Sequence, residues 1–363
     1  MTPSAALDSP VFLLFVAITL GMLVVGGAIL ALLRFGLKRD VGHAWRSYRS
    51  WLVMVPLVLL AIFLGRIAFV AFVGLLSILG FREFARATGL SRDRALCGVV
   101  YAGIVAVGVV SLTPDPRLSV TGWYGMFMVL PVYVVAAILL IPILRNRSQG
   151  QLQSVSLAAL GFLYIGWMFG HLAFLANANP ASLEPTVAEP AIANVATAVE
   201  KGGQSPSHHT PYRWNGVGPQ GDSPPFSTHA YGYLLFLIFA VELNDIAAFT
   251  FGRLLGRHPL RNNISPKKTW EGALGALAVS LALPWLLWFC FPHFSPRELV
   301  LTGLIVGVGG QLGDLSISLI KRDLGVKDMG AAISGHGGIL DRIDSMIYVA
   351  PLFFHMVRWF HDL

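Results

Sequence analysis

The sequence predicts an all-α integral membrane protein with about ten transmembrane helices. Of its 363 residues, 55% are hydrophobic and only 12% are charged, which is about half the ~25% share of charged residues in a typical globular domain. Apolar runs close to the ~20 residues that a helix needs to cross a bilayer recur along the whole chain. The segments between these runs alternate between rich and poor in Lys and Arg, as they do in polytopic membrane proteins.

Ten apolar runs are interpreted as spans. They are residues 11–33, 51–65, 67–81, 96–112, 122–144, 155–177, 231–252, 271–292, 298–320 and 343–360. The second and third are short and divided by Arg66, so they could form one tight hairpin, and nine spans is the alternative count. The first run is too long for the apolar part of a cleavable signal and follows no positive charge, so we expect it to be a span.

The basic residues are concentrated in alternate connecting segments. Segments 34–50, 82–95, 145–152, 253–270 and 321–342 carry 20 of the 26 Lys and Arg residues. Ten spans put these segments on one side of the membrane, which the positive-inside rule predicts to be the cytoplasmic side, with both termini outside. The net charge of +7 therefore indicates contact with anionic membrane lipids or phosphorylated substrates, and we expect no nucleic-acid partner.

The chain divides into three predicted regions. Residues 1–177 form an N-terminal group of transmembrane helices with few polar residues inside the spans. Residues 178–230 are rich in Pro, Ala, Gly and Ser, which predicts a flexible loop on the extracytoplasmic side. Residues 231–363 form a C-terminal group of transmembrane helices that holds most of the polar residues, so we expect the catalytic chemistry there.

The histidines of the predicted loop and the two cysteines give weak signals. His208, His209 and His229 have no cysteine or carboxylate at metal-ligand spacing, so we do not expect them to bind a metal. Cys97 and Cys290 lie at predicted helix ends and fit neither a disulfide framework nor a metal cluster. We expect them to be buried thiols.

A first polar patch lies inside the seventh span. Glu242 and Asp245 are three residues apart and therefore share one face of a helix. Ionisable residues inside a span indicate a functional site. A hydrogen bond between neighbouring helices is the alternative interpretation.

A second patch, NNISPKKTWEG, precedes the eighth span. Ser265 followed by Pro266 predicts a capped helix that begins at the proline. The free N–H groups of such a helix start, together with Lys267 and Lys268, would bind phosphate. The spacing is equally compatible with a capped helix that has a positive cytoplasmic flank.

A third patch begins within the ninth span. Asp314, Ser318 and Lys321 follow one another at i, i+4 and i+7 and therefore share one helical face. Gly309 and Gly313 form a G-x-x-x-G pair, which predicts that another helix approaches closely at this point.

The third patch continues beyond the ninth span into a glycine-rich segment. Its residues His336, Gly337 and Gly338 have the composition of a backbone that wraps around phosphate oxygens. The segment follows the basic stretch that contains Lys327.

The third patch ends with two aspartates at a predicted helix start. Asp341 and Asp344 could cap that helix and interact with its dipole. This interpretation does not explain Asp314. Three carboxylates beside several Lys and Arg residues indicate Mg²⁺ holding a polyphosphate, because Mg²⁺ prefers a few carboxylates together with substrate oxygens.

Taken together, these motifs resemble the signature of the phosphatidate cytidylyltransferase family, the CDP-diacylglycerol synthases. The resemblance rests on Ser318-Leu319-Ile320-Lys321-Arg322, Lys327-Asp328, His336-Gly337-Gly338 and Asp341-Arg342-Ile343-Asp344. ISPKKTWEG at 264–272 is similar to a second motif of the family, and Asp245 with Ala248 and Phe249 to a third. The good match covers about residues 240–350. The sequence departs from the family pattern at Phe249, Ala276 and Ser334.

The resemblance implies that phosphatidate attacks the α-phosphorus of CTP, which gives CDP-diacylglycerol and pyrophosphate. It implies a catalytic set and a substrate-binding set of residues. The catalytic set is Asp314, Lys321, Arg322, Asp341 and Asp344, with the three aspartates holding Mg²⁺ and a second cation nearby. The substrate-binding set is Asp245, Ser265, Lys267, Lys268, Ser318, Lys327, His336, Gly337, Gly338 and Arg342. The resemblance further implies a homodimer in a bacterial inner membrane, with the active site facing the cytoplasm.

Two alternative functions stay open at this point. Acids at the membrane midplane and broken helices also mark ion-coupled transporters, but that class predicts inverted repeats, and none is visible. A related membrane nucleotidyltransferase with another lipid acceptor or nucleotide fits the same residues, because Phe249, Ser334 and the long loop depart from the family pattern.

Overall fold

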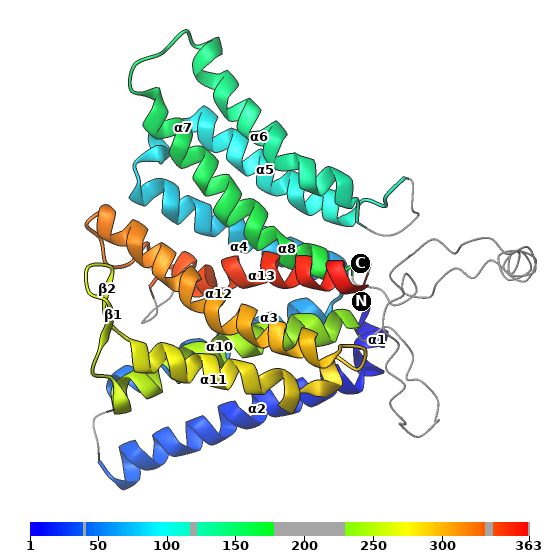
Figure 1. Ribbon diagram of the computed structural model, residues 1–363, viewed down its shortest axis with the longest axis vertical. Coiled ribbons are helices and arrows are strands. Elements are labelled where there is room, and N and C mark those ends of the chain that lie inside the picture. Colours follow the sequence, from blue (N-terminus) through cyan, green and yellow to red (C-terminus); the bar gives the residue numbers. More distant parts are fainter. Residues whose placement is uncertain (39–40, 117–121, 178–228, 331–336, 362–363) are drawn as a thin grey trace, which may run out of the picture.

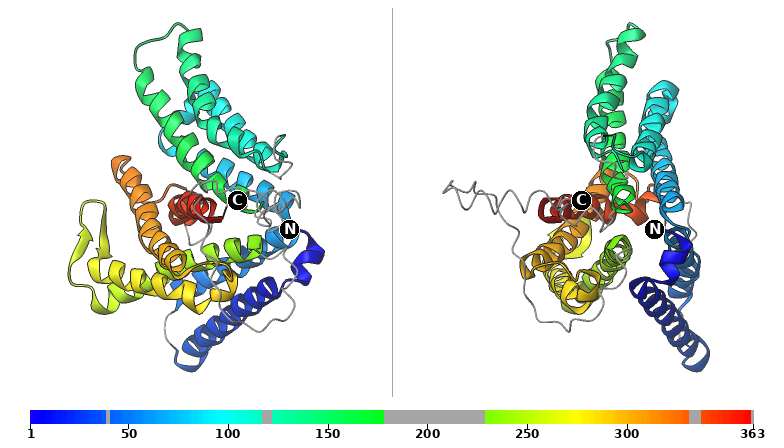
Figure 2. Two further views of the ribbon diagram at one scale, coloured as in Figure 1. Left: turned by 45° about the vertical axis from the view of Figure 1, so that its right-hand side comes forward. Right: turned by 90° about the vertical axis from the view of Figure 1, so that its right-hand side faces the viewer.

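In the computed structural model, the chain is described over residues 1–38, 41–116, 122–177, 229–330 and 337–361 (Figure 1). Nearly all of the described secondary structure is helical (Figures 1 and 2), which confirms the all-α class. The predicted loop, including His208 and His209, lies outside the described residues, and so does the side chain of His229.

The N-terminal half consists of helices joined by short connections. They are α1 (Pro3–Leu7), α2 (Pro10–Ala31), η1 (Leu32–Gly36), α3 (Gly42–Phe63), α4 (Arg66–Ala87), η2 (Leu90–Arg92), α5 (Arg94–Leu112), α6 (Tyr124–Leu144), α7 (Gln151–Leu160), η3 (Gly161–Met168) and α8 (Phe169–Leu175). The helices α7 and α8 and the π-helical segment η3 form one continuous rod. π-Helical turns of this kind often occur at functional sites.

The C-terminal half contains the remaining helices and one small hairpin. They are α10 (His229–Leu255), β1 (Pro259–Arg261), β2 (Ser265–Thr269), α11 (Trp270–Leu286), η5 (Trp288–Cys290), α12 (Pro296–Asp323) and α13 (Leu340–His361). The helices α10, α11, α12 and α13 pack on one another, and α13 also packs against α4 and α8 of the N-terminal half. Because α13 contacts both halves, the boundary drawn from the sequence between 1–177 and 231–363 stays a prediction.

Helices occupy all ten predicted spans. Within the described ranges, eight helices are long and apolar enough to cross a membrane. The helix α11 has only 17 residues, or roughly 25 Å at 1.5 Å per residue. The helix α13 has 22 residues but carries acidic and basic side chains in its first and last turns. These two helices complete the ten predicted positions.

The expected short lengths of the second and third spans were wrong. The helices α3 and α4 each have 22 residues, and they are separated by Leu64 and Gly65. Gly65 has a φ of 101°, a backbone conformation that residues other than glycine rarely adopt. The apolar runs look short because charged residues such as Arg46 and Arg82 extend both helices into the basic segments.

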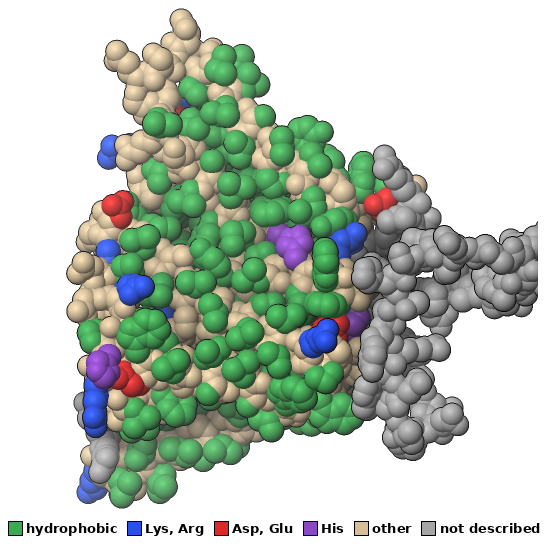
Figure 3. Space-filling model, in the orientation of Figure 1, with side chains coloured by type: hydrophobic (Ala, Val, Ile, Leu, Met, Phe, Trp, Pro, Cys, Tyr) green, Lys and Arg blue, Asp and Glu red, His purple; other side chains and the backbone are tan. Residues whose placement is uncertain are grey.

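The basic connecting segments gather at one end of the molecule. Figure 3 shows Lys and Arg side chains along the edge where the β1–β2 hairpin and the C-terminal end of α12 lie (compare Figure 1). Both termini lie at the opposite end (Figure 1). This grouping agrees with the alternation of basic and non-basic segments in the sequence.

The prediction that a helix begins at Pro266 was wrong. Ser265–Thr269 forms strand β2, which pairs antiparallel with β1 through Arg261↔Ser265 and Pro259↔Thr269. A proline disfavours helical backbone at the residue before it, so Ser265 is extended. The helix begins instead at Trp270, and the side chain of Thr269 accepts a hydrogen bond from the Gly272 N–H as its cap.

One further expectation concerns the two cysteines, and one further local feature is the start of α12. Cys97 and Cys290 are free and buried, as predicted. The helix α12 begins with a capping box, in which the Glu298 side chain accepts a hydrogen bond from the Ser295 N–H. This arrangement satisfies N–H groups that would otherwise lack partners at the helix start.

Candidate active site

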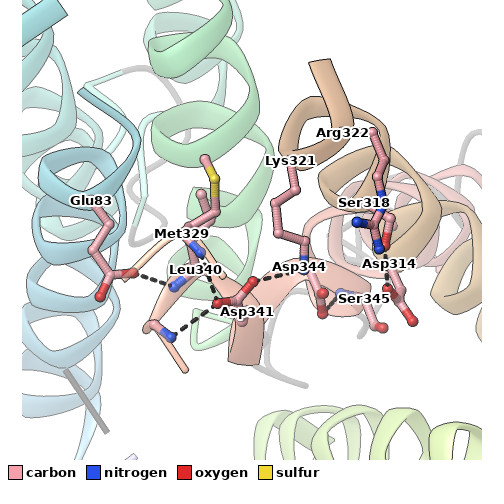
Figure 4. Close-up of polar contacts among 12 residues, drawn as sticks. Glu83, Asp314, Ser318, Lys321, Arg322, Met329, Leu340, Asp341, Asp344 and Ser345 are labelled. Atoms are coloured by element: carbon pink, nitrogen blue, oxygen red, sulfur yellow. Dashed lines mark hydrogen bonds and ion pairs between the residues drawn. The ribbon is translucent and has the colours of Figure 1, made fainter. Parts of the chain in front are cut away.

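Two glycines of α12 allow α13 to approach closely, as the G-x-x-x-G pair predicted. A Cβ atom on Gly313 would contact the backbone of Asp344 and would lie 2.7 Å from the Cα of Ser345. A Cβ atom on Gly309 would meet the Val349 side chain at 3.3 Å. The close crossing brings Asp314, the residue after Gly313, next to the first turns of α13 (Figure 4).

Three carboxylates are close together at this crossing. Asp314 interacts electrostatically with both Asp245 of α10 and Asp344 of α13, and the latter two with each other. Ser345 links two of them, because its N–H donates to Asp344 over 2.7 Å and its hydroxyl donates to Asp245 over 3.3 Å. Asp344 is only 8% exposed. The crossing therefore concentrates negative charge in a largely buried place.

Lys268 of the β1–β2 hairpin supplies the nearest positive charge. Its Nζ lies 2.6 Å from Asp314 Oδ2 and also donates to Gln311 Oε1 over 3.1 Å. Asp314 further accepts a hydrogen bond of 3.2 Å from the Ser318 hydroxyl, which confirms that the two residues share a helical face. Successive strand residues point to opposite sides, so Lys267 is exposed while Lys268 is half-buried.

Asp341 organises the glycine segment. Its carboxylate accepts hydrogen bonds from Lys321 Nζ over 2.9 Å, from the Met329 N–H over 3.2 Å and from the Gly338 N–H over 2.9 Å. Gly337 has a φ of 80°, which favours glycine. Asp341 thus joins the end of α12, the segment after it and the start of α13 (Figure 4).

The contacts of Asp341 are relevant to the prediction that Asp314, Asp341 and Asp344 together hold Mg²⁺. Figure 4 shows Asp341 directed toward Met329 and the glycine segment, while Asp314 and Asp344 lie beside Ser318 and Ser345. Among the described residues, no three His, Cys, Asp or Glu side chains have the spacing of a formed metal site. The assignment of Mg²⁺ to Asp314, Asp341 and Asp344 stays a prediction.

Glu83 of α4 is a residue that the sequence reasoning missed. Its Oε2 accepts a hydrogen bond of 3.0 Å from the Leu340 N–H at the start of α13 (Figure 4). A Cβ atom on either Gly330 or Gly338 would collide with the Glu83 carboxylate. The sequence pattern that could have indicated Glu83 is an acidic residue in a basic segment, directly after an apolar run. Its partner is 257 residues away in the chain, so the sequence did not connect the two.

The remaining predicted residues surround these clusters. Arg322 Nε donates to the Ile264 carbonyl over 3.1 Å and so ties α12 to the β1–β2 hairpin. Ser265 is half-buried in β2, and Lys327 is exposed in the turn after α12. Arg342 is half-buried and interacts electrostatically with Asp245. His336 lies outside the described residues.

A comparison with known proteins decides the family. A model of the cytidylyltransferase family matches residues 45–360. The chain belongs to this family. The match begins in α3 and ends in α13, so it includes N-terminal helices for which the sequence had shown only a general similarity.

Several curated proteins are similar to about a third of this family member. It is 48% identical over 122 residues to the phosphatidate cytidylyltransferase of Staphylococcus haemolyticus and 47% identical over 122 residues to that of Staphylococcus aureus; each alignment covers 33% of this chain and 46% of the relative. It is 40% identical over 126 residues to the uncharacterized protein YnbB of Escherichia coli, over 35% of this chain and 42% of the relative. The chain therefore spans less than half the length of the curated relatives that it matches.

Proposed function

We propose that this cytidylyltransferase family member uses CTP and phosphatidate to make CDP-diacylglycerol and pyrophosphate in phospholipid biosynthesis. The observation that carries the proposal is the meeting of Lys268, Asp314, Lys321, Asp341 and Asp344 at the basic end of the α12–α13 crossing. The similarity to the phosphatidate cytidylyltransferases of the two Staphylococcus species supports the choice of lipid.

The proposed reaction is a displacement at phosphorus. A phosphate oxygen of phosphatidate forms a bond to the α-phosphorus of CTP, and the bond from that phosphorus to the β-phosphate oxygen breaks. Pyrophosphate leaves with the electron pair. The lipid phosphate is already ionised at neutral pH, so no strong general base is needed, and catalysis depends on positioning and on neutralising oxygen charge.

The basic side chains supply that neutralisation in the proposal. Lys321 and Arg322 lie at the end of α12 and would stabilise the leaving pyrophosphate. Lys268 would hold a phosphate of CTP, with Ser265 and Lys267 on the same strand. Lysine and arginine form strong charge-assisted hydrogen bonds with phosphate oxygens.

The nucleotide would lie against the glycine segment. The Gly338 N–H donates a hydrogen bond to Asp341, Gly337 adjoins it, and His336 and Lys327 precede the two glycines in the sequence. Backbone N–H groups of such segments bind phosphate oxygens. Ser318 would orient Asp314, to which it donates a hydrogen bond.

The carboxylates at the crossing fit a divalent cation. Asp245, Asp314 and Asp344 repel one another, and among the described residues only Lys268 lies within ion-pair distance of any of them. Such an excess of buried negative charge requires compensation. We propose that Asp314 and Asp344 hold Mg²⁺, with Asp341 or Asp245 as the third carboxylate. When bound, the cation would reduce the negative charge on the phosphate oxygens.

The protein would lie in a bacterial inner membrane with this site facing the cytoplasm. The support is the gathering of 20 of the 26 Lys and Arg residues in segments at the same end as the site, since cytoplasmic loops carry an excess of these residues. The cytoplasm is also the source of CTP. A homodimer stays a prediction from the family resemblance.

The proposal is tested by the turnover of radiolabelled CTP by purified protein in mixed micelles with a panel of phospholipids. We expect Asp314→Asn, Asp341→Asn and Asp344→Asn each to lower Mg²⁺-dependent formation of CDP-diacylglycerol by roughly a hundredfold or more, as for the loss of a charge-stabilising group. Asp323→Asn is the matched control, because Asp323 is exposed at the end of α12, and it should retain most activity. Turnover with a different lipid phosphate but none with phosphatidate would reassign the acceptor. Parental turnover in Asp344→Asn at limiting Mg²⁺ would contradict the metal assignment.

A further inference from the structure

A cavity of about 760 Å³ lies beside the candidate active site, between α3, α4, α8, α10 and α13. Most of its lining is apolar and comes from α3 and α4, including Leu57, Phe72 and Leu76. Leu57 and Leu75 are 49% and 52% exposed, so the cavity is open on the side where α3 and α4 would face the hydrocarbon of the bilayer. A lipid could therefore enter it from within the membrane.

Polar side chains gather at two places in this cavity. Arg46, Arg49 and Ser50, in the first turns of α3, line the end that belongs to the basic segment 34–50. Arg46, Ser50, Val53 and Leu57 follow one another at i, i+4, i+7 and i+11. They therefore form a single stripe that runs from charged to apolar along α3.

The second polar place connects the cavity to the candidate active site. Glu242 and Arg342 line the cavity and interact electrostatically with each other. Arg342 also interacts with Asp245, one of the three carboxylates at the α12–α13 crossing. The Nε of Arg342 is buried and has no hydrogen-bond partner among the described residues. A ligand in the cavity would thus meet this guanidinium group, which interacts in turn with the carboxylate cluster through Asp245.

The excess of positive side chains in the cavity favours an anionic ligand. Three arginines line it with one acid, Glu242, and neither Arg46 nor Arg49 forms an ion pair with a described residue. The apolar wall of α4 from Phe69 to Leu79 spans eleven residues, and the ten steps between its ends cover roughly 15 Å at 1.5 Å per residue. An anionic headgroup joined to acyl chains matches both features, whereas free inorganic phosphate or CTP would leave the apolar wall empty.

We infer that this cavity is the subsite of the lipid acceptor, and that Arg46 and Arg49 hold its phosphate while the acyl chains lie along α3 and α4. The inference rests on the proposed function, because it assigns the phosphate-bearing diacyl lipid of that reaction to a place outside the family motifs. Arg342 lies on the path from this subsite to the carboxylate cluster. The two arginines of α3 then determine which lipids are accepted.

Steady-state kinetics in mixed micelles of dioleoyl phosphatidate test the role of the arginines. We expect the double variant Arg46→Gln/Arg49→Gln to raise the KM for phosphatidate roughly tenfold to a hundredfold, as for the loss of charged hydrogen bonds, and to leave the KM for CTP within twofold. Arg82→Gln/Arg86→Gln is the matched control. These two exposed arginines of α4 lie in another basic segment and do not line the cavity, so both KM values should stay parental.

A steric pair of variants tests the acyl-chain path. Leu57→Trp puts a larger side chain into the cavity and should raise the KM for phosphatidate severalfold. Leu60→Trp is its control, because Leu60 is 50% exposed on the same helix but does not line the cavity. Equal KM values in the two tryptophan variants would overturn the proposed path. An unchanged lipid KM together with a changed oligomeric state in Leu57→Trp would also overturn it, and would assign the cavity to a second copy of the chain.

Lipid binding gives a readout that does not depend on turnover. We expect native mass spectrometry of the detergent-purified protein to show retention of phosphatidate over phosphatidylglycerol and phosphatidylcholine, and loss of that preference in Arg46→Gln/Arg49→Gln. A preference that survives in the double variant would overturn the inference. Absence of CTP turnover in the parental protein, with phosphatidate binding that depends on Arg46 and Arg49, would refute the proposed function and leave the lipid site standing.

Discussion

The crossing of α12 and α13 makes Gly313→Ala the most informative single substitution. A methyl group on Gly313 would lie 2.7 Å from the Cα of Ser345, where ordinary contacts begin near 3.4 Å. The obstructing atoms belong to the backbone, so no side chain can rotate away. The Asp344 carbonyl oxygen lies nearer still, so the helix α13 would have to move by at least roughly 0.7 Å, the difference between these two distances. This shift would carry Asp344 away from Asp314.

The expected effect on stability is small and the effect on activity large. Overpacking costs about 1–3 kcal/mol, and the better helix propensity of alanine offsets about 1 kcal/mol of it. A displacement of about 1 Å in a catalytic site can cost about a hundredfold in rate. We therefore expect Gly313→Ala to lower CTP turnover by tens of fold while its melting temperature in detergent falls by only a few degrees.

Two other glycines provide matched controls. A Cβ atom on Gly98 in α5 would have no neighbour within 4 Å, and the nearest neighbour of one on Gly309 would be the Val349 side chain at 3.3 Å. We expect Gly98→Ala to behave like the parent and Gly309→Ala to lose no more than a few-fold in rate. Parental turnover in Gly313→Ala would refute the reasoning, and so would an equal loss in Gly98→Ala.

Two further predictions follow from individual contacts. Glu83→Ala leaves the Leu340 N–H without its acceptor, so it should lower the free energy of unfolding by about 1–3 kcal/mol and raise the KM for CTP. Glu83→Gln keeps an acceptor and should have the milder effect in the same thermal and kinetic assays. Equal effects of the two variants would contradict the hydrogen-bonding role of Glu83. Burial would raise the pKa of Asp93, but hydrogen bonds from Arg145 and from the Leu96 and Ala95 N–H groups outweigh it and hold this pKa below its ordinary value. The stabilisation is therefore complete above the ordinary pKa near 3.8 and is lost as the pH falls through the lower folded-state pKa. Arg145→Gln should lower the free energy of unfolding by less than about 1 kcal/mol at pH 7 and by progressively less as the pH falls through the folded-state pKa, and a pH-independent loss would contradict the assignment.

Much of the architecture could be predicted from the sequence. The helices at the ten predicted span positions, the concentration of basic segments at one end and the close approach at Gly313 all follow from local patterns of apolar, charged and small residues. The lengths of α3 and α4 could not be predicted, because charged residues such as Arg46 hide the helix ends that project from the apolar region. The helix predicted at Pro266 was wrong because pairing with β1 decided the conformation of Ser265.

The sequence predicted which residues belong to the candidate site more fully than it predicted how their side chains pair. The sequence predicts that the motif residues Asp314, Lys321 and Asp341 belong to one site. The structure decided that Lys321 pairs with Asp341 and that Lys268 pairs with Asp314. It also brought Asp245 into the carboxylate cluster.

The sequence by itself determined that this chain is a polytopic helical membrane protein, because the transfer of side chains into a bilayer is additive over local segments and the charge bias acts on each short loop. Only the tertiary structure decided which side chains meet. Glu83 reaches Leu340 across 257 residues, and α3 and α4 form the arginine-lined cavity beside the carboxylates of α10 and α13. Such contacts depend on how helices distant in the chain pack against one another. That packing is set by close backbone approach and side-chain shape. A local pattern such as G-x-x-x-G indicates a close approach but does not say which helix makes it.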